Sequence, residues 1–245
     1  VLSSRWEHPI IFTTVVQFLN IFFSSSSQDL RKLQSLMNSV IIFDEAQSVP
    51  IHCSTLFNEV CNYLSRYLNC TIVLCTATQP LLHKLEKPIQ LSNNNEIVSD
   101  VNDAYSALKR VEVIDKTIKG GYSSQEAVDF ILKVKETNKS VLFVVNTIKA
   151  AENLFNYIKH TKYSGKIYYL CSNICPMHRS DVISQMKNSL DMKEDMICIS
   201  TQVIECGVDI SFDAVIRSLS GLDSIAQAAG RCNRHGEKKM GKVYV

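Results

Sequence analysis

Short apolar runs alternate with amphipathic stretches along most of this 245-residue chain. The runs are rich in residues that favour strands, and most are apolar throughout rather than at every second position. We predict strands at residues 10–14, 40–44, 71–75, 111–114, 140–145, 167–171, 196–200, 214–217 and 242–245. Between several of them, apolar residues recur at spacings of three and four, which predicts helices at residues 54–68, 123–137 and 147–160.

Apolar strands separated by helices are typical of parallel sheets that helices cover on both faces. The chain is also longer than one average domain. Its periodicity weakens between residues 91 and 122, where Ser92-Asn-Asn-Asn95 and Gly120-Gly121 interrupt the pattern. We therefore predict an α/β protein of two domains, residues 1–105 and 106–245, each with a mainly parallel sheet.

The composition is that of an ordinary globular protein, with 46% hydrophobic and 20% charged residues and a net charge of +2. Residues 1–105 carry 6 Lys and Arg against 9 Asp and Glu, and the rest carries 20 against 15. A modestly basic second domain is compatible with a polyanionic partner without requiring one. Nine irregularly spaced cysteines do not suggest a disulfide framework, and polar residues interrupt the apolar run at 10–23. We expect a cytoplasmic protein without a membrane partner.

The strand predicted at residues 40–44 ends in the tetrapeptide Asp44-Glu45-Ala46-Gln47. The carboxyl ends of strands line the ligand crevice of an open α/β sheet. In nucleotide hydrolases one carboxylate at such a place holds Mg²⁺ and a neighbour orients the attacking water. For the acidic pair alone a solvated turn is the more common explanation, but the motifs that follow favour the catalytic one.

The next predicted strand ends in Thr76-Ala77-Thr78. Small hydroxyl residues at a strand end can hydrogen-bond acids on the neighbouring strand and so report their state. By itself this is a common turn composition. This motif becomes informative because it follows the acidic tetrapeptide in the sequence, after one intervening helix and one strand.

Near the carboxyl terminus, Gln227, Arg231 and Arg234 are spaced by four and three residues, so a helix would place them on one face. Small alanines beside them permit close approach, and the group suits a triphosphate contacted by arginine fingers, which are typically worth about 10³–10⁵ in rate. The alternative is a surface helix with solvated charges. Upstream, Gly207 permits a tight turn and Asp209 can accept a hydrogen bond from a ribose hydroxyl.

The chain contains no phosphate-binding loop of its own. Gly236 to Val243 nearly matches G-x-x-x-x-G-K-[ST], but Val243 lacks the hydroxyl that binds Mg²⁺. The segment from Cys171 to His178 lacks a second ligand pair, so we expect no metal there. Instead, His178 and Arg179 are expected to face a ligand or a backbone phosphate.

Together these motifs resemble superfamily 2 helicases and, more narrowly, the helicase part of the CRISPR-associated helicase–nuclease of type I systems. The phrases that carry the narrower resemblance are Trp6-Glu-His-Pro-Ile-Ile-Phe-Thr-Thr-Val-Val-Gln17, Asp44-Glu-Ala-Gln47, Cys175-Pro-Met-His-Arg179 and Gln202-Val-Ile-Glu-Cys-Gly-Val-Asp209. The resemblance covers nearly the whole chain. The chain differs from many relatives in having Gln47 where they have histidine. This difference should alter the coupling of hydrolysis to lobe movement more than it alters metal binding.

The resemblance implies two RecA-like lobes, the first incomplete, with ATP and Mg²⁺ between them and single-stranded DNA across their tops. It implies that Asp44 and Glu45 hold the metal and activate water, and that Gln47, Thr76 and Thr78 link hydrolysis to lobe movement. Gly207, Asp209, Gln227, Arg231 and Arg234 would contact the nucleotide. The residues implied to contact nucleic acid are Thr14, Gln17, Asn146, Thr147, His178, Arg179, Thr201 and Gln202.

The implied partners are single-stranded DNA, an RNA-guided surveillance complex and a linked or separate HD nuclease, since no His is followed by Asp in this chain. We expect a piece of a longer protein that hydrolyses ATP poorly or not at all alone. The alternatives are a generic superfamily 2 DNA or RNA helicase outside CRISPR systems, and a non-catalytic nucleic-acid-binding remnant.

Overall fold

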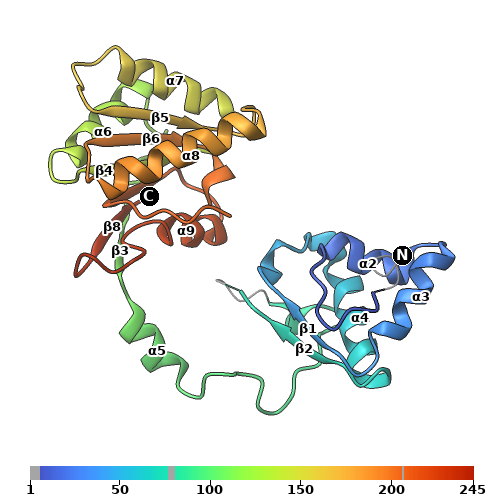
Figure 1. The fold of residues 1–245 in the computed structure, drawn as a ribbon. Helices are drawn as coiled ribbons and strands as arrows, with labels where there is room; N and C mark the ends of the chain where they lie inside the picture. Colours follow the sequence, from blue (N-terminus) through green and yellow to red (C-terminus); the bar gives the residue numbers. More distant parts are fainter. Residues whose placement is uncertain (1–5, 77–80, 206) are drawn as a thin grey trace. The chain divides into compact units, whose positions relative to one another are not determined.

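The computed structural model describes residues 6–76, 81–205 and 207–245. The chain divides into two compact units, Val1–Ser99 and Asp100–Val245 (Figure 1). The predicted boundary near residue 105 falls inside helix α5 (Val101–Leu108), which belongs to the second unit.

The first unit combines three helices with a parallel pair of strands. Its main elements are α2 (Val15–Phe23), α3 (Ser27–Ser35), β1 (Val40–Phe43), α4 (Ser54–Tyr67) and β2 (Thr71–Leu74). In the pair, Val40 lies opposite Thr71 and Phe43 opposite Leu74. The prediction of a strand at residues 10–14 is wrong. The Thr14 hydroxyl instead accepts a hydrogen bond from the Gln17 backbone N–H at 3.2 Å and caps α2, so helix initiation overrides the β-favouring composition.

The core of the first unit lies on one face of this strand pair. Phe43 of β1 contacts the rings of Phe18 and Phe57 edge-on, with centroids 5.1 and 4.8 Å apart. On the opposite face, Val40 and Ile42 are 66% and 62% exposed. Within the described residues helices therefore cover one face of β1, so the prediction of cover on both faces is wrong for this unit.

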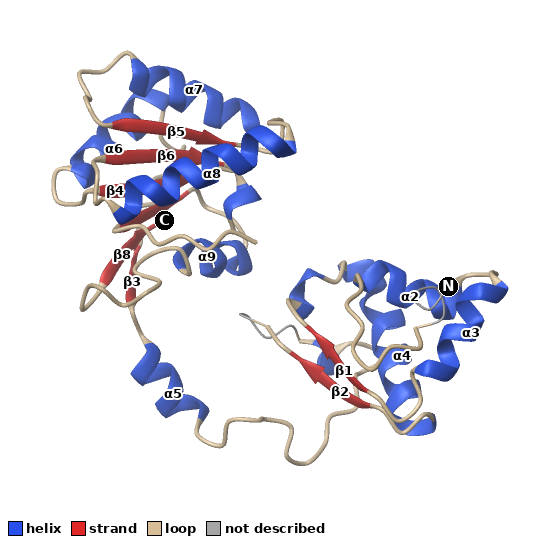
Figure 2. Ribbon diagram, viewed as in Figure 1, coloured by secondary structure: helices blue, strands red, loops and turns tan. Residues whose placement is uncertain are grey.

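The second unit contains a six-stranded sheet in the order β3-β8-β7-β4-β6-β5, with every pair parallel (Figure 2). The strands are β3 (Val111–Ile114), β4 (Ser140–Val144), β5 (Lys166–Leu170), β6 (Met196–Ser200), β7 (Ala214–Arg217) and β8 (Gly241–Tyr244). The helices that follow α5 are α6 (Ser124–Lys135), α7 (Ile148–Lys159), α8 (Pro176–Asp191) and α9 (Leu222–Ala229). Helix α6 begins with a capping box, in which Ser123 and Glu126 are bonded reciprocally.

Alternate residues of the central strand β4 enter two different cores. Leu142 and Val144 lie in the cluster that includes Val182 of α8 and Ala228 of α9. Val141 and Phe143 lie in the cluster that contains residues of α6 and α7. Helices therefore cover both faces of this sheet, and the predicted α/β class with mainly parallel sheets is confirmed.

Parallel pairing places the carboxyl ends of the strands at a common edge of each sheet. The loops after β4, β5, β6 and β7 consequently gather at one edge of the second unit, and those after β1 and β2 at one edge of the first. Every cysteine that the structure describes carries a free thiol. Among the described residues no helix is both long and apolar enough to span a bilayer.

Candidate functional site

The acidic tetrapeptide turns sharply as it leaves β1. Glu45 adopts a left-handed backbone conformation with φ of 53°, which is uncommon for a residue with a Cβ atom. Its backbone N–H donates to Asp44 Oδ1 at 3.0 Å, and its side chain accepts from the amide of Gln47. The Ala46 N–H donates to the Cys75 carbonyl at 3.1 Å and fixes the turn to the segment after β2. Asp44 and Glu45 are both exposed, so their carboxylates are accessible.

This arrangement suits a hard cation. Magnesium is usually held by one or two carboxylates together with water and substrate phosphates, and the exposed pair supplies the carboxylate oxygens. The carboxylates of Asp44 and Glu45 are therefore suitable ligands for Mg²⁺. Elsewhere in the described residues no group of three or more His, Cys, Asp or Glu side chains is placed to hold a metal, including around Cys171.

Of the residues predicted to couple hydrolysis to movement, Gln47 follows β1 in the sequence, and Thr76 and Thr78 follow β2. Thr76 is half-buried two residues after the end of that strand. Thr78 lies outside the described residues. Gln47 is half-buried and its Oε1 atom has no hydrogen-bond partner, although its amide nitrogen donates to Glu45.

In the first unit the two residues predicted to contact DNA stabilise a helix start. Thr14 caps α2, and Gln17 Oε1 accepts a hydrogen bond from the Thr13 hydroxyl at 3.0 Å. Both Thr14 and Gln17 are exposed. An exposed helix N-terminus lined by polar side chains is compatible with a phosphate contact, and that role remains a prediction.

In the second unit most of the predicted DNA-contacting residues lie at the carboxyl edge of the sheet. Asn146 and Thr147 follow β4, and Thr147 caps α7 through the Ala150 N–H at 3.2 Å. Thr201 and Gln202 follow β6; Thr201 is buried, whereas Gln202 is exposed and donates to Ser224 Oγ at 3.4 Å. Parallel strands thus bring together two loops that are about 55 residues apart in the sequence.

The segment after β5 contributes a third loop to this edge. His178, in the first turn of α8, is exposed. Arg179 instead donates to the carbonyls of Ser172 and Ile174 at 3.3 and 3.2 Å, and its buried Nε atom has no partner. Arg179 therefore shapes the loop, while His178 offers its ring to solvent.

The prediction of one helical face for Gln227, Arg231 and Arg234 is wrong. Helix α9 ends at Ala229, and the chain then turns so that Phe212 and Cys232 form a bridge. Gly230 caps the helix and interrupts the spacing from which the common face was inferred. Gln227 remains on the helix, whereas the two arginines occupy the turn that follows it.

The two arginines differ in their surroundings. Arg231 is buried and donates from Nε to the Ile204 carbonyl at 3.0 Å and from an Nη atom to the Glu205 carbonyl at 2.5 Å. Arg234 is exposed and forms an ion pair with Asp209, with Nε and Oδ1 2.8 Å apart. Gly207 has a positive φ of 72°, in keeping with the predicted turn before Asp209.

A buried ion pair lies beneath this edge and was missed from the sequence. Glu205 Oε1 accepts from Arg217 Nε at 2.9 Å, and the two side chains are 3% and 0% exposed. Burial raises the pKa of the Glu205 carboxyl, and the neighbouring Arg217 guanidinium opposes that rise. Arginine at the end of an otherwise apolar strand is unusual, and this was the signal that could have revealed it.

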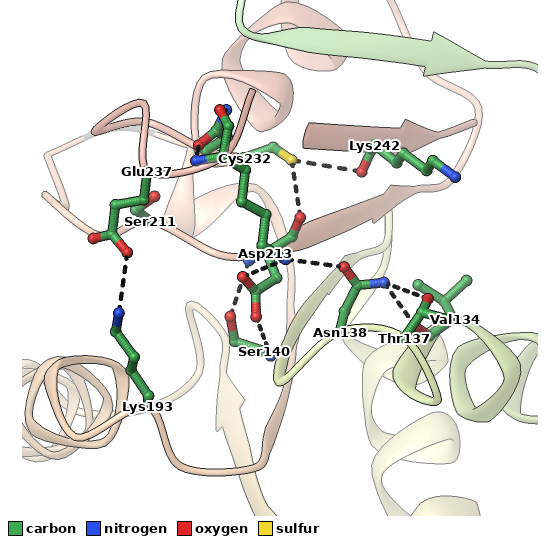
Figure 3. Close-up of polar contacts among 12 residues, drawn as sticks. Val134, Thr137, Asn138, Ser140, Lys193, Ser211, Asp213, Cys232, Glu237 and Lys242 are labelled. Atoms are coloured by element: carbon green, nitrogen blue, oxygen red, sulfur yellow. Dashed lines mark hydrogen bonds and ion pairs between the residues drawn. The ribbon is translucent and has the colours of Figure 1, made fainter. Parts of the chain in front are cut away.

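A depression of about 740 Å³ lies at the opposite, amino edge of the second sheet. Asp213 is one of the residues that line it; its carboxylate accepts from the Ser140 N–H at 3.0 Å and its own N–H donates to the Ser140 hydroxyl (Figure 3). Burial by itself would raise the pKa of Asp213, but the ion pair with Lys238 and the bonds to Ser140 lower it. Acidic and basic side chains line the depression together, so it has no clear preference for an anion or a cation.

Comparison with known proteins identifies relatives of this chain. A family model described as "CRISPR-associated nuclease/helicase Cas3, C-terminal" matches residues 137–237. The chain is 26% identical to a putative CRISPR-associated nuclease/helicase Cas3 of Methanocaldococcus jannaschii, covering 96% of this chain and 33% of that protein. It is 61% identical to a CRISPR-associated nuclease/helicase Cas3 of Haloferax volcanii, covering 100% of this chain and 35% of that protein.

Solved structures show the same fold. T. fusca Cas3 matches with a TM-score of 0.72 at 17% identity, over 95% of this chain and 32% of that one. A chain of the structure titled "CRISPR RNA-guided surveillance complex, pre-nicking" matches with a TM-score of 0.64 at 16% identity, over 93% and 33%. The chain thus spans about a third of the length of the relatives that it matches.

Proposed function

Because this chain belongs with the Cas3-type helicases, to which it is related over nearly all of its length, we propose that it forms the motor part of an ATP-driven translocase. The motor moves along single-stranded DNA and unwinds target DNA in CRISPR interference, an antiviral defence in the cytoplasm. The observation that carries the proposal is the exposed acidic pair Asp44–Glu45 at the carboxyl end of β1. It lies where α/β proteins bind ligands, in a turn that hydrogen bonds hold in place.

In this proposal Asp44 holds Mg²⁺ and Glu45 orients the attacking water. A bound magnesium ion neutralises the negative charge that the phosphates carry during hydrolysis. Gln47, Thr76 and Thr78 pass the state of the nucleotide to the DNA-binding residues. One related structure is titled as a complex of T. fusca Cas3 with ATP, which supports ATP as the nucleotide.

Residues of the second unit act on the same nucleotide. Arg234, exposed and paired with Asp209, exchanges this carboxylate for the γ-phosphate when ATP binds, since a guanidinium binds phosphate with the same bidentate geometry as carboxylate. Asp209 is then free to accept from the ribose. Gln227 and Arg231 also contact the nucleotide in this proposal. Gly207, with its positive φ, allows the turn that places Asp209 for the ribose contact.

Single-stranded DNA binds at the carboxyl edge of the second sheet and at the start of α2. Its contacts come from Thr14, Gln17, Asn146, Thr147, His178, Arg179, Thr201 and Gln202. Their hydroxyl, amide, imidazole and guanidinium groups suit phosphate oxygens, which would make recognition independent of base sequence. The partners are an RNA-guided surveillance complex, which exposes the strand, and an HD nuclease, linked or separate, which cuts it.

The test uses the full-length natural protein that contains these residues. We expect ATP hydrolysis that oligo-dT stimulates at least tenfold and that oligo-U stimulates less. Glu45→Gln should abolish hydrolysis while fluorescent ATP still binds, whereas Glu112→Gln, an exposed carboxylate in β3, should change neither. Stimulation by RNA alone would favour a generic superfamily 2 helicase, and absence of hydrolysis would favour a non-catalytic binding protein.

The 245-residue chain by itself should hydrolyse ATP poorly, because it has no G-x-x-x-x-G-K-[ST] sequence with which to hold the phosphates. The measurement is the steady-state rate of phosphate release with and without oligo-dT. A robust DNA-stimulated rate from this chain would contradict the proposal.

A further inference from the structure

One guanidinium joins three loops at the carboxyl edge of the second sheet. Arg217, at the end of β7, donates to Glu205 in the loop after β6 at 2.9 Å. It also donates to Asn146 Oδ1 in the loop after β4 at 2.6 Å and to the Ser218 carbonyl in the loop after β7 at 2.9 Å. Asn146 in turn donates to the Leu219 carbonyl at 2.8 Å. These contacts fix the loops after β4, β6 and β7 relative to one another.

A second guanidinium holds the same turn through its backbone carbonyls. Arg231 donates to the carbonyls of Ile204 and Glu205, while Arg217 binds the Glu205 side chain. The turn at 204–205 is therefore held by two arginines. It also separates Thr201 and Gln202, proposed to contact DNA, from Gly207 and Asp209, proposed to contact the nucleotide.

Stability alone does not account for this arrangement. A buried ion pair is often no more stabilising than apolar residues of similar volume, because both charges must leave water. The network here is also incompletely satisfied, since the buried Nη2 atom of Arg217 has no hydrogen-bond partner. A strand that only needed to fill the core would end more favourably in an apolar residue. The polar groups are better explained by the direction that they impose on the loops.

We propose that Arg217 and Glu205 are positioning residues that couple DNA binding at Asn146, Thr201 and Gln202 to the nucleotide-contacting residues, through the turn that Arg231 holds. This inference rests on the proposed function. A shift of the loop after β4 or β6 when DNA binds is transmitted through the Arg217 guanidinium to Glu205. The Glu205 carbonyl then carries it to Arg231 and to the turn that contains Arg234.

The test measures ATP hydrolysis by the full-length natural protein as a function of oligo-dT concentration. In Arg217→Met and Glu205→Gln the oligo-dT concentration for half-maximal stimulation should rise at least tenfold, and maximal stimulation should fall. Glu205→Gln keeps the shape of the side chain and so tests the idea if Arg217→Met does not fold. Arg217→Lys should lose less of the DNA stimulation than Arg217→Met. It keeps the positive charge opposite Glu205 but lacks the branched guanidinium that also reaches Asn146.

The matched control is Ile131→Ala in α6, a fully buried apolar residue far in sequence from the network. It should lower the melting temperature without moving the DNA dependence. If Glu205→Gln changes the melting temperature alone, the coupling role is wrong while the proposed function stands. If the unmodified protein shows no DNA-stimulated hydrolysis, the proposed function itself fails.

Discussion

The carboxyl edges of the two sheets carry polar groups in opposite environments. In the first unit, Asp44 and Glu45 are exposed, and their carboxylates accept hydrogen bonds from the Glu45 backbone N–H and the Gln47 side chain. In the second unit, Glu205 and Arg217 are buried and bond to loops up to about 70 residues apart. An exposed group is available for a ligand and costs the fold little, whereas a buried one determines how its neighbours lie. The edge of the first sheet is therefore suited to binding a ligand, and the buried pair of the second is suited to transmitting movement between loops.

The two sheets also differ in burial, and the sheet of the second unit is the more buried. The six strands of the second unit have helices on both faces, and residues such as Ile197 are fully buried. The strand pair of the first unit leaves Val40 and Ile42 exposed. The second unit thus contains enough apolar surface to hold a buried charge in place, and the first has its core on one side only.

The largest effect should come from removing the buried guanidinium. Arg217→Met removes the principal partner of the buried Glu205 carboxylate, so the free energy of unfolding of the second unit should fall by about 3–5 kcal/mol. Urea denaturation of the 245-residue chain at pH 7 measures this. The matched control is Lys166→Met, which removes an exposed ion pair with Glu194 and should cost at most about 1 kcal/mol. Equal losses in the two variants would mean that burial of the pair is unimportant.

The next effect should be on activity without a change in stability. Asp44→Asn in the full-length natural protein should lower ATP hydrolysis about a hundredfold or more, equivalent to about 2.7 kcal/mol in the barrier. Because Asp44 is exposed, the melting temperature should stay unchanged. Asp103→Asn, an exposed acid in α5, is the control for the loss of one carboxylate. A reduction of less than threefold would mean that Asp44 does not hold the metal.

The sequence predicted the features that depend on near neighbours. Apolar runs located the strands of the second sheet, and apolar residues at spacings of three and four located helices α6 and α7, because both patterns depend on residues a few positions apart. The acidic tetrapeptide was placed at a strand end for the same reason. The α/β class and the resemblance to the CRISPR-associated helicase–nuclease are confirmed.

What the sequence could not predict depends on distant partners or on competition between local preferences. The Arg217–Glu205 pair joins two strand ends that only the fold brings together. The spacing of Gln227, Arg231 and Arg234 fits a helix, but Gly230 ends α9 before the arginines. At residues 10–14 the composition favours a strand, yet the capping bond of Thr14 begins a helix instead.

A smaller effect should appear on acidification, at the amino edge of the second sheet. The pKa of Asp213 is lower in the folded chain than its ordinary value, so the folded state binds fewer protons than the unfolded state there. Its contribution to stability is present above about pH 4 and is lost as the pH falls through the folded pKa. In Asp213→Asn the difference from the unmodified chain should be largest at pH 7 and shrink toward pH 3, as urea denaturation at a series of pH values would show. A constant difference would mean that Asp213 acts through its shape and not its charge.

The smallest effect should come from the exposed face of β1. Ile42→Thr should change the free energy of unfolding of the 245-residue chain by no more than about 0.5 kcal/mol, because Ile42 is 62% exposed and threonine keeps the β-branched shape. The same substitution at the fully buried Ile197 of β6 should cost well over 1 kcal/mol, since it places a hydroxyl in an apolar core. Measured in the full-length natural protein, the two substitutions could converge. If Ile42→Thr there costs nearly as much as Ile197→Thr, another part of that protein covers this face. The contrast between the two sheets would then be a property of the 245-residue segment and not of the whole motor.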